Sequence, residues 1–154
     1  MTLSPTLTNP GQSVTLTATV SPLTASGSVT FKDGSAVLGM TTLSGGTASF
    51  AVSALSLGSH SLTAVYAGDT FNAASTSSAV THTVNKNTTV LTLTSSPNPS
   101  SSGQNATLTA TVFSLAATGS VTFKDGSAVL GTSTVITGTA TLAVPARYLS
   151  ALIR

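Results

Sequence analysis

The chain has 154 residues, a net charge of +2 and no cysteine, which excludes disulfide bonds, thiolate metal sites and cysteine nucleophiles. Five residues are basic and three are acidic, and the basic ones stand singly, whereas a nucleic-acid-binding surface needs clustered Lys and Arg. No segment approaches the ~20 apolar residues of a transmembrane helix, so we expect neither a nucleic-acid partner nor membrane insertion.

The first 85 residues show a series of short strand patterns separated by turn signals. Residues 2–8 predict a first strand, which ends at the turn signal Asn9-Pro10-Gly11. Residues 12–20 alternate between apolar residues and threonine, which predicts a half-buried strand. Further strands are expected over 28–39 (a hairpin), 41–43, 47–52, 58–66 and 77–84. Seven or eight short strands without a helical segment indicate an antiparallel β-sandwich.

One stretch of this series occurs twice. Residues 27–39, GSVTFKDGSAVLG, return letter for letter as residues 119–131, which lie 92 positions later. The Asp33-Gly34 dipeptide between apolar residues predicts a hairpin closed by a type I′ turn, with Phe31 opposite Ala36. In this register four apolar residues share the face expected to be buried: Val29, Phe31, Ala36 and Leu38.

The period of the repeat divides the chain. Residues 1–85 predict a complete sandwich, 86–87 a short linker and 88–154 a second, partial copy. The second copy follows the first as far as Ala146 and then departs from it, so it has no counterpart of residues 62–84. We therefore expect the second copy to be truncated and to lack its last two strands.

The missing strands would be costly. The strand near residues 61–66 is expected to be central and to carry three inward side chains, each worth roughly 1.5–3 kcal/mol when buried. Because a whole domain is stable by only about 5–15 kcal/mol, we expect the second copy to be incompletely folded, or completed by a strand from another chain that pairs with its open edge. Alternatively, residues 145–154 could form one or two helical turns, with Pro145 first.

Candidate catalytic residues are few. His60, His82 and Asp69, with serines nearby, could form a hydrolase triad, but the chain has no Gly-x-Ser-x-Gly elbow. Asp69 follows Gly68 in a turn, where an aspartate usually bonds its own backbone. Both histidines are expected at surface or rim positions, and a two-histidine metal site would have no third ligand. We predict no catalytic residue.

Candidate ligand-binding residues are equally few. Asp33 and Asp125 could suggest calcium, but calcium takes six to eight oxygen ligands and the chain has three acidic residues. Both are therefore interpreted as turn residues. Tyr66 and Phe71 are expected to be core aromatics near a turn rather than a platform for stacking sugars. We predict no metal-binding or cofactor-binding residue and no cofactor.

Several linked motifs point to a known family. The order PNP, GQ, ATLTATV, GSVTFKDGSAVLG, GTA, LGSHSLTAVYAGD and STSSAV resembles the bacterial immunoglobulin-like repeat domains of the group-3 type, which occur in tandem in large surface and secreted proteins. The resemblance covers residues 1–85 entirely and 88–146 in part. It implies an Ig-like sandwich, an extracellular or cell-surface setting and a role as spacer, stalk or adhesion module, without catalytic residues.

These observations predict an all-β chain of tandem Ig-like antiparallel sandwiches. We expect a non-enzymatic structural spacer of an extracellular repeat protein, with neighbouring repeats of the same parent chain as its partners. The alternative is an adhesion module whose loops at one end of the sandwich contact a glycan or a protein.

Overall fold

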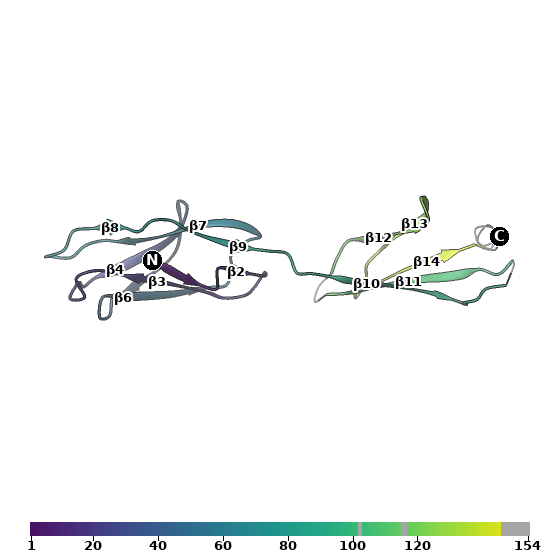
Figure 1. Cartoon of the computed structure of the whole chain (residues 1–154), viewed down its shortest axis with the longest axis horizontal. Coiled ribbons are helices and arrows are strands. Elements are labelled where there is room, and N and C mark those ends of the chain that lie inside the picture. Colours follow the sequence, from purple (N-terminus) through teal and green to yellow (C-terminus); the bar gives the residue numbers. More distant parts are fainter. Residues whose placement is uncertain (102, 115–116, 146–154) are drawn as a thin grey trace. The chain divides into compact units, whose positions relative to one another are not determined.

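The computed structural model describes residues 1–101, 103–114 and 117–145. They form strands and loops that divide into two compact units, Met1–Asn87 and Thr88–Arg154 (Figure 1). No helix in the described part of the chain is long and apolar enough to cross a membrane. The helical turns considered for the tail after Pro145 lie outside the described residues.

The first unit is a β-sandwich of two sheets, as predicted. One sheet has the order β1-β3-β6 and the other the order β2-β9-β7-β4-β5, with β8 paired to β7. The strands are β1 (Thr2–Ser4), β2 (Leu7–Thr8), β3 (Val14–Thr19), β4 (Ser28–Asp33), β5 (Ala36–Thr42), β6 (Thr47–Val52), β7 (Gly58–Tyr66), β8 (Ser75–Thr76) and β9 (Val80–Val84). The pairing is antiparallel except between β2 and β9, which run parallel. Strand β7 is central, as expected, because it lies between β4 and β9.

The first predicted strand is in fact two strands in different sheets. β1 pairs with β3 in one sheet, and β2 pairs with β9 in the other. The change of sheet occurs at Pro5, which has no N–H group to donate to a ladder. The chain therefore contributes to both layers within its first eight residues.

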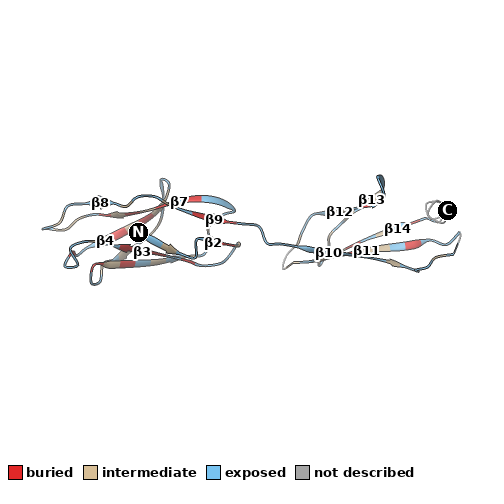
Figure 2. Ribbon diagram, viewed as in Figure 1, coloured by how far each residue is buried: buried red, intermediate tan, exposed pale blue. Residues whose placement is uncertain are grey.

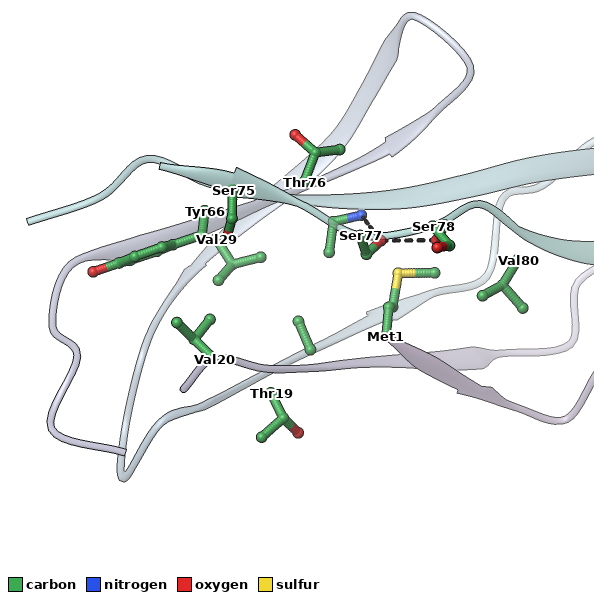
Figure 3. Close-up of a pocket in the computed structure, with 12 residues that line it drawn as sticks. Met1, Thr19, Val20, Val29, Tyr66, Ser75, Thr76, Ser77, Ser78 and Val80 are labelled. Atoms are coloured by element: carbon green, nitrogen blue, oxygen red, sulfur yellow. Dashed lines mark hydrogen bonds between the residues drawn. The ribbon is translucent and has the colours of Figure 1, made fainter. Parts of the chain in front are cut away.

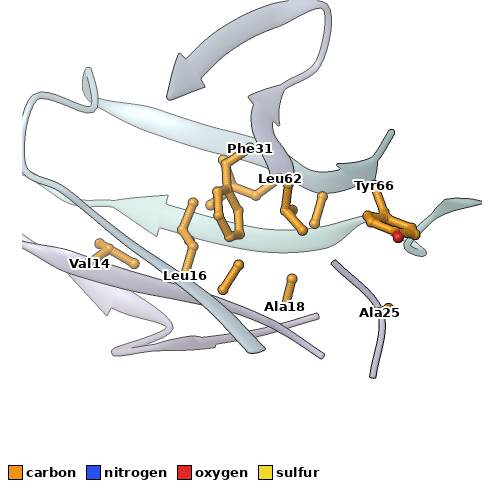
Figure 4. Packing of buried hydrophobic residues seen from close by; sticks show 10 residues of the cluster. Val14, Leu16, Ala18, Ala25, Phe31, Leu62 and Tyr66 are labelled. Atoms are coloured by element: carbon orange, nitrogen blue, oxygen red, sulfur yellow. The ribbon is translucent and has the colours of Figure 1, made fainter. Parts of the chain in front are cut away.

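The core of the first unit lies between its two sheets. Buried and exposed residues alternate along the strands (Figure 2). Leu16 on β3 points toward Phe31 on β4 and Leu62 on β7, and all three side chains are fully buried (Figure 4). The Phe31 ring also stacks on Phe50, with centroids 6.0 Å apart. The apolar alternation predicted for β3 and β7 is therefore confirmed.

The first hairpin has a different turn from the predicted one. A type I′ turn requires a positive φ at both of its central residues. Gly34 has φ +54°, but Asp33 has no positive φ, since Thr137 is the one non-glycine residue with a positive φ in the described part of the chain. Asp33 and Gly34 therefore do not form the centre of a type I′ turn. Asp33 instead pairs with Ala36. Because of a bulge between Phe31 and Lys32, Phe31 lies opposite Gly39. A Cβ at Gly39 would collide with the Phe50 ring, so any other residue here would displace that ring.

The altered register changes the buried face of the hairpin. Val29 and Phe31 are buried and Leu38 packs against the core, as predicted. Ala36 is exposed, so its predicted inward position was wrong. The local turn rule missed the bulge, which shifts the two sides of the hairpin relative to each other.

The second unit repeats part of this arrangement. Strands β10, β11 and β14 form one sheet, and β12 pairs with β13. Their bounds are β10 (Val90–Ser96), β11 (Ala106–Phe113), β12 (Ser120–Asp125), β13 (Ala128–Thr134) and β14 (Thr139–Val144). Ala110, Phe123 and Ala140 form its small buried cluster. Among the described residues of this unit, no strand corresponds to β7, β8 or β9.

Candidate functional site

The two histidines are buried, which corrects the prediction of surface or rim positions. His60 on β7 and His82 on β9 lie directly opposite each other, with 7% and 0% of their surface exposed. The alternation of apolar and polar residues along both strands indicated this burial. His60 shares a face with Leu62, and His82 shares a face with Val84, so both histidines point to the inner side of the sheet.

His60 is held by two oxygen acceptors. Its Nδ1–H donates to the Asp33 carboxylate at 2.6 Å, and its Nε2–H donates to the Ser56 carbonyl at 2.8 Å. Both bonds favour the doubly protonated ring, so the Ser56 carbonyl and, next to it, Asp33 raise the pKa of His60 above its ordinary value. The Asp33 carboxylate also accepts the Ser61 backbone N–H at 3.1 Å. Asp33 therefore ties the first hairpin to β7.

His82 joins the second strand of the unit to the last one. Its Nε2 atom and the Thr8 hydroxyl form a hydrogen bond of 2.9 Å, and both residues are buried. Nδ1 of His82 has no hydrogen-bond partner among the described residues. Thr8 precedes a turn signal, and nothing in its local sequence predicts a partner 74 positions away.

The structure does not assemble the candidate triad. His60 and Tyr66 are six residues apart on β7, which corresponds to roughly 20 Å along a strand, and Asp69 lies beyond Tyr66. Both ring nitrogens of His60 are occupied by Asp33 and Ser56, so no serine hydroxyl is activated there. The described residues contain no group of three acidic, histidine or cysteine side chains that could hold a metal ion.

Asp69 organises the turn after β7, as predicted. Oδ1 accepts the backbone N–H groups of Phe71 at 2.8 Å and Asn72 at 2.7 Å, and Oδ2 accepts that of Ser26 at 2.8 Å. These bonds, the one from Ser26 first, hold the pKa of Asp69 well below its ordinary value. The Tyr66 hydroxyl donates to the Ser26 carbonyl at 2.8 Å. Asp69 and Tyr66 thus fix the same end of the sandwich through one residue.

The two aromatic residues near this turn differ in position. Tyr66 is buried in the core, as predicted. Phe71 is 94% exposed, so the prediction of a core position was wrong. The hydrogen bonds from Phe71 N–H and Asn72 N–H to Asp69 shape the loop so that the Phe71 side chain projects outward.

A cavity of about 270 Å³ opens between the two sheets of the first unit. Figure 3 shows the Met1 side chain directed across it toward Ser77 and Ser78. The Ser77 hydroxyl accepts the Ala64 N–H and donates to the Ser78 carbonyl, both at 3.0 Å. Ligand pockets usually measure roughly 300–1,000 Å³ and contain convergent polar groups. This cavity is smaller, and the Ser77 hydroxyl is already engaged, so the cavity resembles a gap in sheet packing more than a ligand site.

The comparison with known families agrees with the fold. The family model of the bacterial Ig-like domain (group 3) matches residues 1–85 and 93–151. A search of curated proteins found no match. Among solved structures, the human OSCAR ligand-binding domain is similar over 95% of this chain and 81% of that chain, with 19% identity and a TM-score of 0.41. Because the family model matches well over half of the chain, the chain belongs to the bacterial Ig-like domain family of group 3.

Proposed function

We propose that the chain is a load-bearing spacer of an extracellular or cell-surface protein, with neighbouring Ig-like repeats of the same parent chain as its partners. Domains of this family are generally non-enzymatic and are typically found at the surface or outside the cell. The observation that carries the proposal is the parallel pairing of β2 with β9, near the beginning and at the end of the first unit.

The parallel pairing places the two ends of the first unit at opposite ends of the sandwich. β2 and β9 run in the same direction because their pairing is parallel, and β9 is antiparallel to β7, so both β2 and β9 run toward the end where β7 begins. The chain therefore enters at the end that carries Phe71 and leaves at the end of the first hairpin. An inserted unit of this kind adds its length to a stalk instead of folding the chain back.

The same pairing forms a clamp between the two ends. We call the Thr8–His82 bond and the two backbone bonds beside it the β2–β9 clamp. The Thr83 N–H donates to the Thr6 carbonyl at 3.3 Å, and the Asn85 N–H donates to the Thr8 carbonyl at 2.8 Å. Tension along the chain pulls β2 and β9 in opposite directions along their length, so the bonds of the clamp are loaded together and do not open one at a time.

Single-molecule stretching of the full chain tests this proposal. We expect the first unit to open in one step that releases roughly 25 nm, since the residues between the clamped strands extend by up to ~3.5 Å each. Thr8→Val removes the buried bond to His82, a loss of about 1–3 kcal/mol, and should speed opening under load roughly tenfold or more. Thr17→Val is the matched control, because the Thr17 hydroxyl bonds Ser49 at an exposed position outside the clamp. Equal opening rates for the two variants would contradict a load-bearing clamp.

One observation favours adhesion as a second candidate function. Phe71 is 94% exposed on a loop whose backbone is fixed by Asp69, and Leu23, in the loop that precedes β4, is 65% exposed. A fixed, exposed aromatic side chain suits contact with a glycan or a protein surface. In a panel of immobilised glycans and surface proteins, Phe71→Ser should abolish any binding that Leu57→Ser, at the opposite end, leaves intact. Identical binding by both variants would count against this role.

A further inference from the structure

The identical hairpins of the two units differ on one side of their first strand. β4 pairs with β5 on one side and with β7 on the other. β12 has the same sequence and pairs with β13 in the same register, but no other described strand pairs with it. We call the side of β12 that faces away from β13 the open β12 edge.

Burial follows this difference. Every residue of β4 is buried or half-buried, whereas four of the six residues of β12 are exposed. β5 and β13, in contrast, have the same burial class at every position. The difference is therefore confined to the strand that adjoins β7 in the first unit. The open β12 edge has the shape and sequence of a surface that β7 covers elsewhere in the same chain.

The polar groups follow the same pattern. Asp33 accepts hydrogen bonds from the His60 ring at 2.6 Å and from the Ser61 backbone at 3.1 Å. Asp125 holds the equivalent place in the identical sequence and is exposed, and its carboxylate has no hydrogen bond or ion pair with a described residue. A strand that ran along β12 as β7 runs along β4 would supply both donors.

We propose that the open β12 edge binds an extended strand of the β7 type from a separate polypeptide. Such a strand carries a basic side chain for Asp125, followed at every second position by apolar residues that take the places of Leu62, Ala64 and Tyr66. These three side chains are 0–5% exposed in the first unit, where they belong to the core. β7 itself is already paired on both sides within its own unit and is not available.

Strand addition of this kind has a defined register. The main-chain hydrogen bonds of the edge give affinity, and alternate side chains give specificity. In the first unit Thr30 lies opposite Val65, so the same position of an added strand should lie opposite Thr122. Thr122 is exposed, and the chain contains no cysteine, so a single cysteine can report this contact.

The test uses disulfide capture of a synthetic peptide by the full chain. The peptide has the sequence of Gly58–Tyr66 with cysteine in place of Val65, and the chain carries Thr122→Cys. In a glutathione redox buffer we expect capture at least tenfold above that by the matched Thr30→Cys chain, where β7 already covers the identical strand. A peptide with cysteine in place of Ser61 should not be captured, because its sulfur would lie four residues, or roughly 13 Å, from the reporter.

A third peptide, which keeps the cysteine in place of Val65, tests the apolar requirement. Aspartate in place of Leu62, a position with 0% exposure in β7, should remove capture by the Thr122→Cys chain. Absence of capture by that chain, or equal capture of every peptide by both chains, would overturn the proposal. So would a disulfide-linked dimer of the Thr122→Cys chain that forms without peptide and excludes it, because the edge would then bind a second copy of this chain.

Discussion

The two copies of GSVTFKDGSAVLG compare one sequence in two surroundings. Both fold into hairpins with the same register and a bulge at the same place, after Phe31 and after Phe123. Yet Lys32 is half-buried and Lys124 is exposed, and the same holds for the aspartates that follow them. Hairpin geometry is therefore set within the stretch itself, whereas burial and polar pairing are set by the strand beside it.

The largest expected difference between the copies is their resistance to trypsin. Cleavage at Lys32 requires β4 to detach from strands on both sides and from the core, which approaches complete unfolding of the first unit. Cleavage at Lys124 requires β12 to separate from β13. We expect the bond after Lys124 to be cut roughly 100-fold faster or more.

Mass-spectrometric mapping of the digest provides this measurement with an internal control. The thirteen residues around the two lysines are identical, so local sequence preference of the protease cancels. Equal protection of both lysines in a monomer would show that the second unit is closed by other residues of its own chain. Equal protection in a dimer alone would indicate that another chain covers β12.

Loss of the aromatic ring should also affect the two copies unequally. Phe31→Ala removes a fully buried ring that stacks on Phe50 and should cost the first unit about 3–5 kcal/mol. Phe123 packs in a smaller cluster, with Leu142 in place of Phe50, so Phe123→Ala should cost the second unit about 1–2 kcal/mol less. Hydrogen exchange read on peptides from each unit gives both values. An equal cost in both units would mean that β7 adds little to the packing of this ring.

The sequence predicted those features that depend on neighbouring residues in the chain. Alternation placed Val14, Leu16 and Ala18 of β3 in the core, and the family resemblance indicated the sandwich. The predicted hairpin register was wrong because the turn rule did not include the bulge after Phe31, which recurs after Phe123 in the second copy.

The candidate site was predicted less well, for related reasons. The histidines were assigned to the surface by residue type, although their alternation with apolar residues indicated the inner face. Phe71 was assigned to the core for the same reason, but the hydrogen bonds of Asp69 shape the loop so that the ring is exposed. The Thr8–His82 bond depends on the parallel pairing of β2 with β9, and no local pattern of the sequence predicts this pairing.

Removal of a carboxylate charge should also lower the stability of the two units unequally, but by a smaller amount. Asp33→Asn weakens the bonds to the His60 ring and the Ser61 backbone, and should cost about 1–3 kcal/mol. Asp125→Asn should change the free energy of unfolding of the second unit by less than about 0.5 kcal/mol, as is usual for exposed sites. Hydrogen exchange of the two hairpins gives both numbers in one experiment. A comparable cost at Asp125 would reveal a partner for this carboxylate.

The smallest expected effect is a pH dependence confined to the first unit, because both histidines of the chain lie there. The Ser56 carbonyl and Asp33 raise the pKa of His60 in the folded state. The resulting stabilisation is fully present below the unfolded pKa of about 6.5 and is lost as pH rises through the higher folded pKa. It should be smaller than the loss in Asp33→Asn, because deprotonation removes the charge of the ring but leaves the Asp33 carboxylate bonded to the Ser61 backbone.

Urea titrations followed by hydrogen exchange between pH 5.5 and 8.5 measure this effect. The free energy of unfolding of the first unit should fall as pH rises above about 6.5, while that of the second unit stays level. His60→Gln should flatten the dependence, since glutamine keeps a donor near Asp33 but does not titrate. A slope that persists in His60→Gln would contradict the assignment of the pH dependence to the bonds of His60 with Ser56 and Asp33. A flat profile in His60→Gln would instead tie the pH dependence to the anchor that joins the first hairpin to β7, where Asp33 accepts hydrogen bonds from the His60 ring and the Ser61 backbone.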